Sequence, residues 1–283
     1  MEVIRAETAG FCMGVILALD KLDSLIQRDV SGKSIYTLGP IIHNPQVLEE
    51  YAKKGVILAH QPDDVSAGRT AVIRAHGIPK HVKSSLLERG VKVVDATCPK
   101  VKRAQLLIEK QAKQGRRLLL YGEESHPEVK GLLSYAQAGA FLFDSIERMN
   151  ELPLEKEDHY CLAAQTTQDR VVFEEMAGSL SSRLGDGLMI LNTICDATQR
   201  RQEEAVHIAR NVEYMVVVGG FNSGNTRRLV QVVAGENTPV THVEGAADLP
   251  MQNFTSVSRV GLTAGASTPK RVIDEIHSIL SGM

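Results

Sequence analysis

Short runs of β-branched and aliphatic residues alternate with amphipathic stretches along the whole sequence. Runs of the first kind are typical of strands and the second of helices, and their regular alternation indicates α/β units with parallel strands. Between Met13 and Val30, aliphatic side chains recur at three- and four-residue steps, which predicts a helix with one buried face. The strand-like runs are Glu2 to Ala6, Ser34 to Leu38, Ala71 to Arg74, Val91 to Val94, Arg117 to Tyr121, Tyr160 to Ala164, Leu188 to Leu191, Tyr214 to Gly219 and Arg259 to Leu262. We therefore expect an α/β protein with mainly parallel sheets.

The composition is that of a globular protein, with 43% hydrophobic and 23% charged residues in a chain of 283. This length suffices for two or three hydrophobic cores. The net charge of −2 argues against a broad nucleic-acid surface, which needs a basic excess. The start of the sequence has no secretory signal pattern, and the early apolar run from Val15 to Leu19 is too short to span a bilayer. We expect a cytoplasmic protein that binds neither nucleic acid nor membrane, with its cysteines reduced.

Three of the four cysteines are widely spaced, and each spacing is close to the length of one small α/β domain. Cys12, Cys98 and Cys195 lie 86 and 97 residues apart. Each follows a strand-like run and precedes a helical stretch, which places it at the carboxyl end of a strand, where parallel sheets bind ligands. The spacing predicts three pseudo-repeated lobes around a shared centre, over residues 1–97, 98–193 and 194–283.

The chemistry of distant single cysteines favours an iron–sulfur cluster over structural zinc, which is normally held by close C-x-x-C pairs. An all-protein cubane needs four sulfur ligands, so three cysteines leave one iron open to act as a Lewis acid. The fourth cysteine, Cys161, lies inside the strand-like run YCLAA, and we expect it to be a packing residue.

Three histidines stand in turns near strand-like runs, where functional residues are common: His43 in GPIIHNP, His76 in RAHGIP and His126 in SHPEV. Glu128 follows His126 across a proline that is expected to open a helix. A carboxylate there either favours the helix dipole or, in a dry pocket, holds a transferable proton. The sequence leaves both alternatives open.

Gly-, Ser- and Asn-containing turns before helices indicate an anion site. The loop after YMVVVGG contains Ser223, Gly224 and Asn225, and GLTAGASTP places Ser267 in a similar turn. AQTTQD adds Thr166 and Thr167. Such turns donate hydrogen bonds to phosphate, although they also serve as ordinary helix caps.

Nine segments, in order, resemble the LytB/IspH family of 4-hydroxy-3-methylbut-2-enyl diphosphate reductases. The segments are GFCMGV, IIHNPQV, AHGI, DATCPKV, HPEV, AQTT, ICDATQRRQ, NSGNTRRL and TAGASTP, spanning residues 10–269. The resemblance implies three α/β lobes around one central 4Fe-4S cluster, with Cys12, Cys98 and Cys195 as its ligands. It further implies that the substrate hydroxyl binds the open iron, and that two electrons and two protons expel water to give isopentenyl and dimethylallyl diphosphates.

The same resemblance assigns roles to individual residues. Glu128 corresponds to the proton-delivering glutamate and Thr166 to the threonine that orients the hydroxyl, and we add His126 to this catalytic set. The substrate-binding residues are His43, His76, His126, Thr166, Thr167, Ser223, Gly224, Asn225 and Ser267. Gly224 stands where some relatives have a second serine, so a backbone N–H is expected to replace a side-chain contact. The expected partners are an allylic diphosphate and an electron donor such as ferredoxin or flavodoxin.

Two other functions fit parts of the pattern. Quinolinate synthase and the diphthamide synthesis proteins also join three lobes with one cysteine each around a cluster, but they lack this set of histidine, HPE and Ser-x-Asn motifs. A cluster-based redox sensor would need an output surface, and no basic DNA-reading element is visible.

Overall fold

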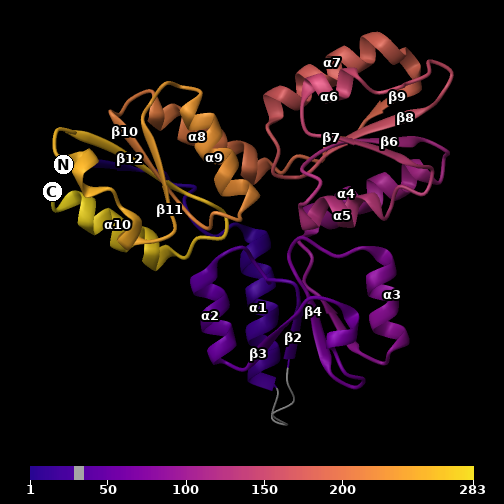
Figure 1. Ribbon diagram of the computed structural model, residues 1–283, viewed down its shortest axis with the longest axis horizontal. Helices are drawn as coiled ribbons and strands as arrows, with labels where there is room; N and C mark the ends of the chain where they lie inside the picture. Colours follow the sequence, from indigo (N-terminus) through magenta and orange to yellow (C-terminus); the bar gives the residue numbers. More distant parts are fainter. Residues whose placement is uncertain (29–34) are drawn as a thin grey trace. The chain divides into compact units, whose positions relative to one another are not determined.

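The computed structural model describes residues 1–28 and 35–283 and contains three four-stranded sheets whose neighbouring strands pair in parallel (Figure 1). Sheet A has the order β11 (Val240–Val243), β10 (Tyr214–Val218), β12 (Arg259–Ala264), β1 (Glu2–Arg5). Sheet B has the order β3 (Val56–Ala59), β2 (Ile35–Leu38), β4 (Thr70–Ile73), β5 (Lys92–Asp95). Sheet C has the order β7 (Ala140–Phe143), β6 (Arg117–Tyr121), β8 (Tyr160–Ala164), β9 (Leu188–Ile190). The predicted α/β class with three parallel-sheet lobes is confirmed.

The three sheets repeat one topology. In sheets B and C the second strand along the chain lies at one edge, the first and third fill the centre, and the fourth forms the other edge. Sheet A has the same order when β10, β11 and β12 are counted first and β1 fourth, because β1 pairs with β12. The start of the chain therefore completes the sheet formed by its end.

Ten helices connect the strands in the described part of the chain. They are α1 (Met13–Arg28), α2 (Pro45–Lys53), α3 (Lys80–Glu88), α4 (Pro99–Ala112), α5 (Pro127–Leu133), α6 (Ile146–Asn150), α7 (Arg170–Leu184), α8 (Asp196–Ala209), α9 (Gly224–Ala234) and α10 (Lys270–Ser281). The predicted helix from Met13 is present, whereas its expected end at Val30 and the expected strand start at Ser34 lie outside the described residues. None of the helices in residues 1–28 and 35–283 has the length and hydrophobicity needed to cross a bilayer.

The central strands are apolar on both faces because helices cover both. Along β10, Val216 and Val218 pack with α10 residues, whereas Met215 and Val217 pack with residues of α8 and α9. Successive side chains of a strand point to opposite faces, so one continuous apolar run fills two cores.

Sheet C is built in the same way, with α6 and α7 on one face and α4 and α5 on the other (Figure 1). Cys161 on β8 packs in the second of these cores beside Ala104, Leu118 and Val129 and is only 1% exposed. The expectation that Cys161 is a packing residue is confirmed, and burial raises the pKa of its thiol to about 12.

By its internal contacts the chain divides into two compact units. One comprises Met1–Ile16, Ile42–Glu50 and Asp196–Met283 and contains sheet A; the other comprises Leu17–Ile41 and Tyr51–Cys195 and contains sheets B and C. The division into lobes at 1–97, 98–193 and 194–283 stays a prediction. The first strand of the chain, β1, pairs within sheet A and not with the strands of sheet B.

The core of sheet C gives a direct stability test. Leu162 on β8 is fully buried against α7, and we expect Leu162→Ala to lower the free energy of unfolding by about 2–5 kcal/mol through lost burial and a residual cavity. Ile190 on the edge strand β9 is 44% exposed, and Ile190→Ala is expected to cost less than about 1 kcal/mol. Urea denaturation of both variants measures the difference, and equal losses would contradict this packing.

Candidate functional site

The first strand of each lobe is followed directly by a glycine. A predicted site residue then stands at the same number of residues past each strand. Gly39, Gly122 and Gly219 come directly after β2, β6 and β10, and each donates its N–H to the end of the neighbouring edge strand, at 2.7, 2.9 and 2.8 Å. Five residues past each strand stand His43, His126 and Ser223. Gly39 and Gly219 have φ values of 74° and 148°, which favour glycine. The three lobes therefore present these side chains from equivalent turns.

The third strand of each lobe is followed by a turn closed by an i to i+3 backbone hydrogen bond. The bonds run from Gly77 N to Arg74 O, from Gln168 N to Gln165 O and from Thr268 N to Gly265 O, at 3.0, 3.1 and 3.1 Å. The third residue of each turn is a predicted substrate-binding residue: His76, Thr167 and Ser267. His76, Thr167 and Ser267 therefore occupy equivalent positions in the three lobes, although they share no sequence motif.

The fourth strand of each lobe leads to a cysteine, and the backbone of each cysteine is held by the turn just described. Cys98 N donates to Ala75 O at 2.9 Å, Cys195 N to Thr166 O at 3.0 Å and Cys12 N to Ala266 O at 3.2 Å. In all three cases the acceptor is the second residue of the turn after the third strand. The cysteine backbones therefore occupy equivalent positions at the carboxyl edges of their sheets.

The three cysteines fit a set of metal-binding thiolates. All three are free thiols of intermediate exposure, unlike the buried Cys161. Each directly precedes a helix, α1, α4 or α8, and a helix N-terminus stabilises negative charge. Partly exposed thiols at equivalent turns fit the ligand set of a cluster held by three cysteines.

Glu128 is the most strongly perturbed carboxyl group at these strand ends. It lies in the first turn of α5, is 1% exposed, and accepts hydrogen bonds from Thr166 N at 2.6 Å and from Thr166 Oγ1 at 2.9 Å. Burial raises its pKa to about 7 despite the two hydrogen bonds from Thr166, which lower it. Near neutral pH this side chain therefore holds a proton in a substantial fraction of molecules.

His126 caps the same helix, and its ring orientation follows from that contact. Glu128 N donates to His126 Nδ1 at 3.2 Å, so a neutral ring carries its proton on Nε2. The rings of His76 and His126 meet edge to face with centroids 5.3 Å apart. Two imidazoles from adjacent lobes can therefore act on one anionic group.

The loop after β10 carries buried donors that suit an anion. Ser223 caps α9, and Asn225 accepts from Ala266 N through Oδ1 at 2.9 Å. The Nδ2 group of Asn225 is buried and makes no hydrogen bond within residues 1–28 and 35–283. A buried donor without a partner is costly unless a ligand accepts from it.

His43 belongs to the same unit as this loop. A Cβ atom at Gly220 would lie 2.6 Å from the His43 carbonyl oxygen, so only glycine permits this approach. The predicted residues thus form two groups. One unit holds Cys12, His43, Ser223, Gly224, Asn225 and Ser267, and the other holds His76, Cys98, His126, Glu128, Thr166, Thr167 and Cys195.

Two residues of α8 support the site without having been predicted. Arg201 is 4% exposed and donates to the carbonyl oxygens of Gly10 and Ala264, at 2.9 and 2.7 Å. Glu204 accepts from the backbone N–H groups of Glu7 and Thr8. Together they fix the loop that leads to Cys12. Arg201 lies in the segment ICDATQRRQ, but neither this segment nor the charge density of QRRQEE reveals the buried partners of the two side chains.

The repeated sheets and their cysteine-bearing edges define a three-lobed α/β protein that gathers polar side chains and thiols at the carboxyl ends of its strands. Residues 3–281 match the LytB protein family, and the chain belongs to that family.

Similar proteins cover the whole chain. A 4-hydroxy-3-methylbut-2-enyl diphosphate reductase from Solidesulfovibrio magneticus is 56% identical over 99% of both chains, and one from Oleidesulfovibrio alaskensis is 55% identical over 100% of both. A solved structure of (E)-4-hydroxy-3-methyl-but-2-enyl diphosphate reductase is 38% identical, with a TM-score of 0.70 and full coverage of both chains. The Plasmodium falciparum reductase, 24% identical with a TM-score of 0.93 over 99% of this chain and 88% of that one, has the same fold.

The raised pKa of Glu128 predicts a pH-dependent stability. Because the folded-state pKa of about 7 exceeds the ordinary value of 4.5, the stability that protonated Glu128 contributes is present below pH 4.5 and is lost as pH rises through 7. Relative to Glu128→Gln, the wild type is expected to lose on the order of 3 kcal/mol between pH 4.5 and 8. Urea denaturation at several pH values measures this. Glu124→Gln, at an exposed neighbour, is the matched control, and identical pH profiles for wild type and Glu128→Gln would refute the assignment.

Proposed function

We propose that the protein reduces 4-hydroxy-3-methylbut-2-enyl diphosphate to isopentenyl and dimethylallyl diphosphates, the final step of the non-mevalonate isoprenoid pathway. In this reaction two electrons and two protons replace a carbon–oxygen bond with a carbon–hydrogen bond and release water. Full-length relatives more than 50% identical are named as this reductase, which supports the same activity here. The structural observation that carries the proposal is the buried Glu128–Thr166 pair at a strand end that also positions Cys195.

The diphosphate is the group by which the substrate is held. Its negative charge and acceptor oxygens match the buried Nδ2 of Asn225, the caps at Ser223 and Gly224, and Ser267. His43, His76, His126, Thr166 and Thr167 complete the donor set in the proposal. Most of these donors are neutral, so hydrogen-bond geometry rather than net charge selects the ligand. Fixing the diphosphate also fixes the position of the reacting carbon–oxygen bond.

Glu128 serves as the proton donor. Hydroxide is a poor leaving group, so cleavage is accelerated when a nearby acid protonates it. A carboxyl group with a pKa of about 7 can be protonated at neutral pH and still release its proton. Thr166, which donates to both carboxylate oxygens, orients Glu128 and can relay a proton through its hydroxyl.

Cys12, Cys98 and Cys195 would hold one 4Fe-4S cluster, which fits three free thiols at equivalent strand ends. When bound, the cluster supplies the electrons and a Lewis-acidic iron. An electron carrier such as ferredoxin or flavodoxin would supply the two electrons, and the reaction would take place in the cytoplasm.

The decisive experiment is anaerobic purification, iron and sulfide counts, and turnover of the hydroxylated allylic diphosphate with reduced methyl viologen. We expect about four iron and four sulfide per chain and formation of both products. Glu128→Gln should keep the iron while turnover falls roughly 10²–10⁴-fold, the scale of losing a general acid. Iron without turnover in the wild type would contradict the proposed reaction, and an unchanged rate in Glu128→Gln would remove Glu128 from it.

The cysteine assignment has a matched pair of variants. Cys161→Ser changes a core residue outside the ligand set, so we expect iron content close to wild type with some loss of stability from burying a hydroxyl. Cys98→Ser makes the same replacement of sulfur by oxygen, but at a proposed ligand. It should therefore lower the iron count markedly. Iron analysis after anaerobic purification distinguishes them. Loss of iron in Cys161→Ser with retention in Cys98→Ser would reverse the assignment.

A further inference from the structure

A basic hollow lies beside α4, on the surface of the unit that contains sheets B and C. It has a volume of about 560 Å³, and among residues 1–28 and 35–283 its lining includes Lys21, Lys102, Arg103 and Lys110 but only one carboxylate, Asp95. The charged lining therefore carries a net charge of +3, whereas the whole chain carries −2. The positive charge of the hollow does not serve the predicted substrate-binding residues, because none of them lines the hollow.

The charge belongs mainly to α4 and not to the equivalent helices of the other lobes. From Pro99 to Ala112, α4 has four basic residues and one acidic residue, a net charge of +3. The helix after Cys12 has two of each, a net charge of zero, and the helix after Cys195 has two basic and three acidic residues, a net charge of −1. The single acid of α4, Glu109, already pairs with Lys80 of α3. Only the helix that follows Cys98 therefore presents a basic face.

One stripe of this helix runs from the cysteine to the end of the basic face. Pro99, Arg103, Leu106 and Lys110 follow one another at steps of four, three and four residues, which places them on the same side of a helix, and all four line the hollow. Leu106 is 57% exposed. An exposed apolar side chain between cations can add a nonpolar contact to an interface whose partner is selected by charge.

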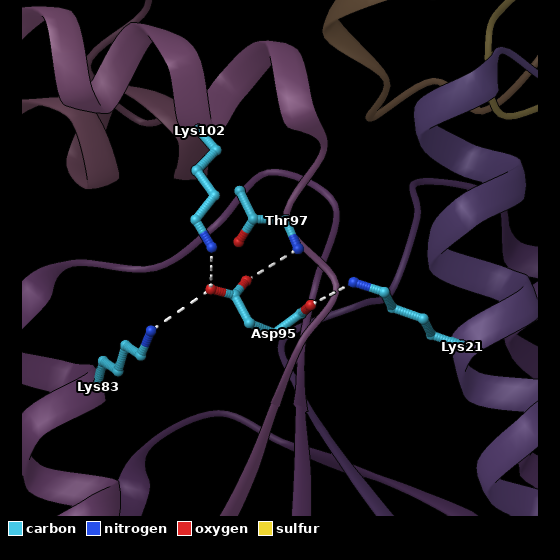
Figure 2. Close-up of polar contacts among 5 residues, drawn as sticks. All are labelled: Lys21, Lys83, Asp95, Thr97 and Lys102. Atoms are coloured by element: carbon cyan, nitrogen blue, oxygen red, sulfur yellow. Dashed lines mark hydrogen bonds and ion pairs between the residues drawn. The ribbon is translucent and has the colours of Figure 1, made fainter.

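Asp95 contacts three lysines, of which Lys21 and Lys102 also line the hollow. Figure 2 shows Lys21 from α1, Lys83 from α3 and Lys102 from α4 approaching it from different elements. Lys102 and Lys83 contact Asp95 Oδ2 at 3.1 and 3.4 Å, and Lys21 donates to its backbone oxygen at 2.7 Å. Burial opposes ionisation of Asp95, but hydrogen bonds from Thr97 and Lys102 prevail and lower its pKa to about 2. The Asp95 carboxylate is therefore ionised at all physiological pH values.

The geometry points to the α4 surface, defined by Lys21, Lys102, Arg103, Leu106 and Lys110, as the docking site of a small acidic one-electron carrier protein that delivers electrons next to Cys98. This inference rests on the proposed function, because it takes Cys98 to be a cluster ligand. Pro99 lines the hollow and is bonded directly to Cys98, so a carrier on this surface lies beside the proposed entry point. Each docking event transfers one electron from the reduced carrier, and two events supply the two electrons of the reaction.

An acidic protein fits this surface better than other polyanions. Electron-carrier encounters use small interfaces with charge complementarity, which raises the association rate while permitting fast release. A nucleic acid would require a longer basic track or aromatic side chains for stacking, and no aromatic residue lines this hollow.

Binding is tested with oxidised plant-type ferredoxin as the acidic probe, by biolayer interferometry at low ionic strength. Arg103→Glu/Lys110→Glu reverses two charges of the stripe and leaves the Asp95 contacts in place, and we expect association to slow roughly 10-fold or more. The difference should vanish in 0.5 M salt, where the screening length falls to a few Å (about 3 Å at 1 M). Arg148→Glu/Lys156→Glu, at exposed positions away from α4, reverses the same charge and should bind like the wild type.

Turnover supplies the second readout. With reduced ferredoxin as donor, the α4 variant should lose most of its rate, whereas with reduced methyl viologen, a small cation that needs no basic surface, its rate should equal that of the wild type. Arg103→Gln/Lys110→Gln, which introduces no new charge, should show a smaller loss in the same direction and serves if the reversed variant fails to fold.

The outcomes separate the two proposals. Unchanged ferredoxin binding in both α4 variants, equal loss in the Arg148/Lys156 control, or selective binding of a DNA duplex at this surface would overturn the docking site. A wild type inactive with methyl viologen would instead refute the proposed reaction, while the binding comparison still decides the docking surface.

Discussion

One backbone hydrogen bond per lobe, from a cysteine amide to the turn after the third strand, is the constraint on which the candidate site depends. The acceptor is Ala75, Thr166 or Ala266, always the second residue of that turn. Because the turn is an extension of a central strand that is paired on both sides, the position of each cysteine backbone is set by the sheet and not by the flexibility of its own loop. In the sheet C lobe the same residue, Thr166, also binds Glu128, so the proposed metal ligand and the proposed acid share one support.

The three lobes share the same backbone turns but carry different hydrogen-bond donors at equivalent positions. The position five residues past the first strand is His43, His126 or Ser223, and the third residue of the turn after the third strand is His76, Thr167 or Ser267. Imidazole and hydroxyl groups differ in reach and in acidity, yet both can donate to an anion from the same turn. Each lobe can therefore present a different donor by changing the side chain at a fixed position, without altering the hydrogen bonds of its sheet.

The nine strands predicted from the sequence are all present, and the described part of the chain contains three further strands that were not predicted and that share one property. β3, β7 and β11 are all edge strands, each the second strand of its lobe. A central strand such as β8 is buried at every residue and therefore forms a recognisable apolar run, whereas β3 exposes Ile57 and Leu58 by 41% and 44%. The placement of β1 in sheet A could not be predicted from the sequence either. The paired residues lie more than 250 positions apart, and such a pairing leaves no local signal in the sequence.

The motifs predict the polar residues of the candidate site, but the protonation of these residues depends on contacts that no local pattern encodes. Glu128 and Asp95 both stand near strand ends, and although the HPEV motif singles out Glu128, neither local sequence shows in which direction the pKa of its carboxyl group is shifted. In the structure Glu128 is enclosed with neutral donors from Thr166, and burial raises its pKa to about 7. Asp95 is partly buried too, but hydrogen bonds from Thr97 and Lys102 lower its pKa to about 2. Opposite environments thus make one carboxyl group a store of protons and the other a permanent anion that holds lysines, and two carboxyl groups separated in this way can serve proton transfer and charge recognition at the same pH.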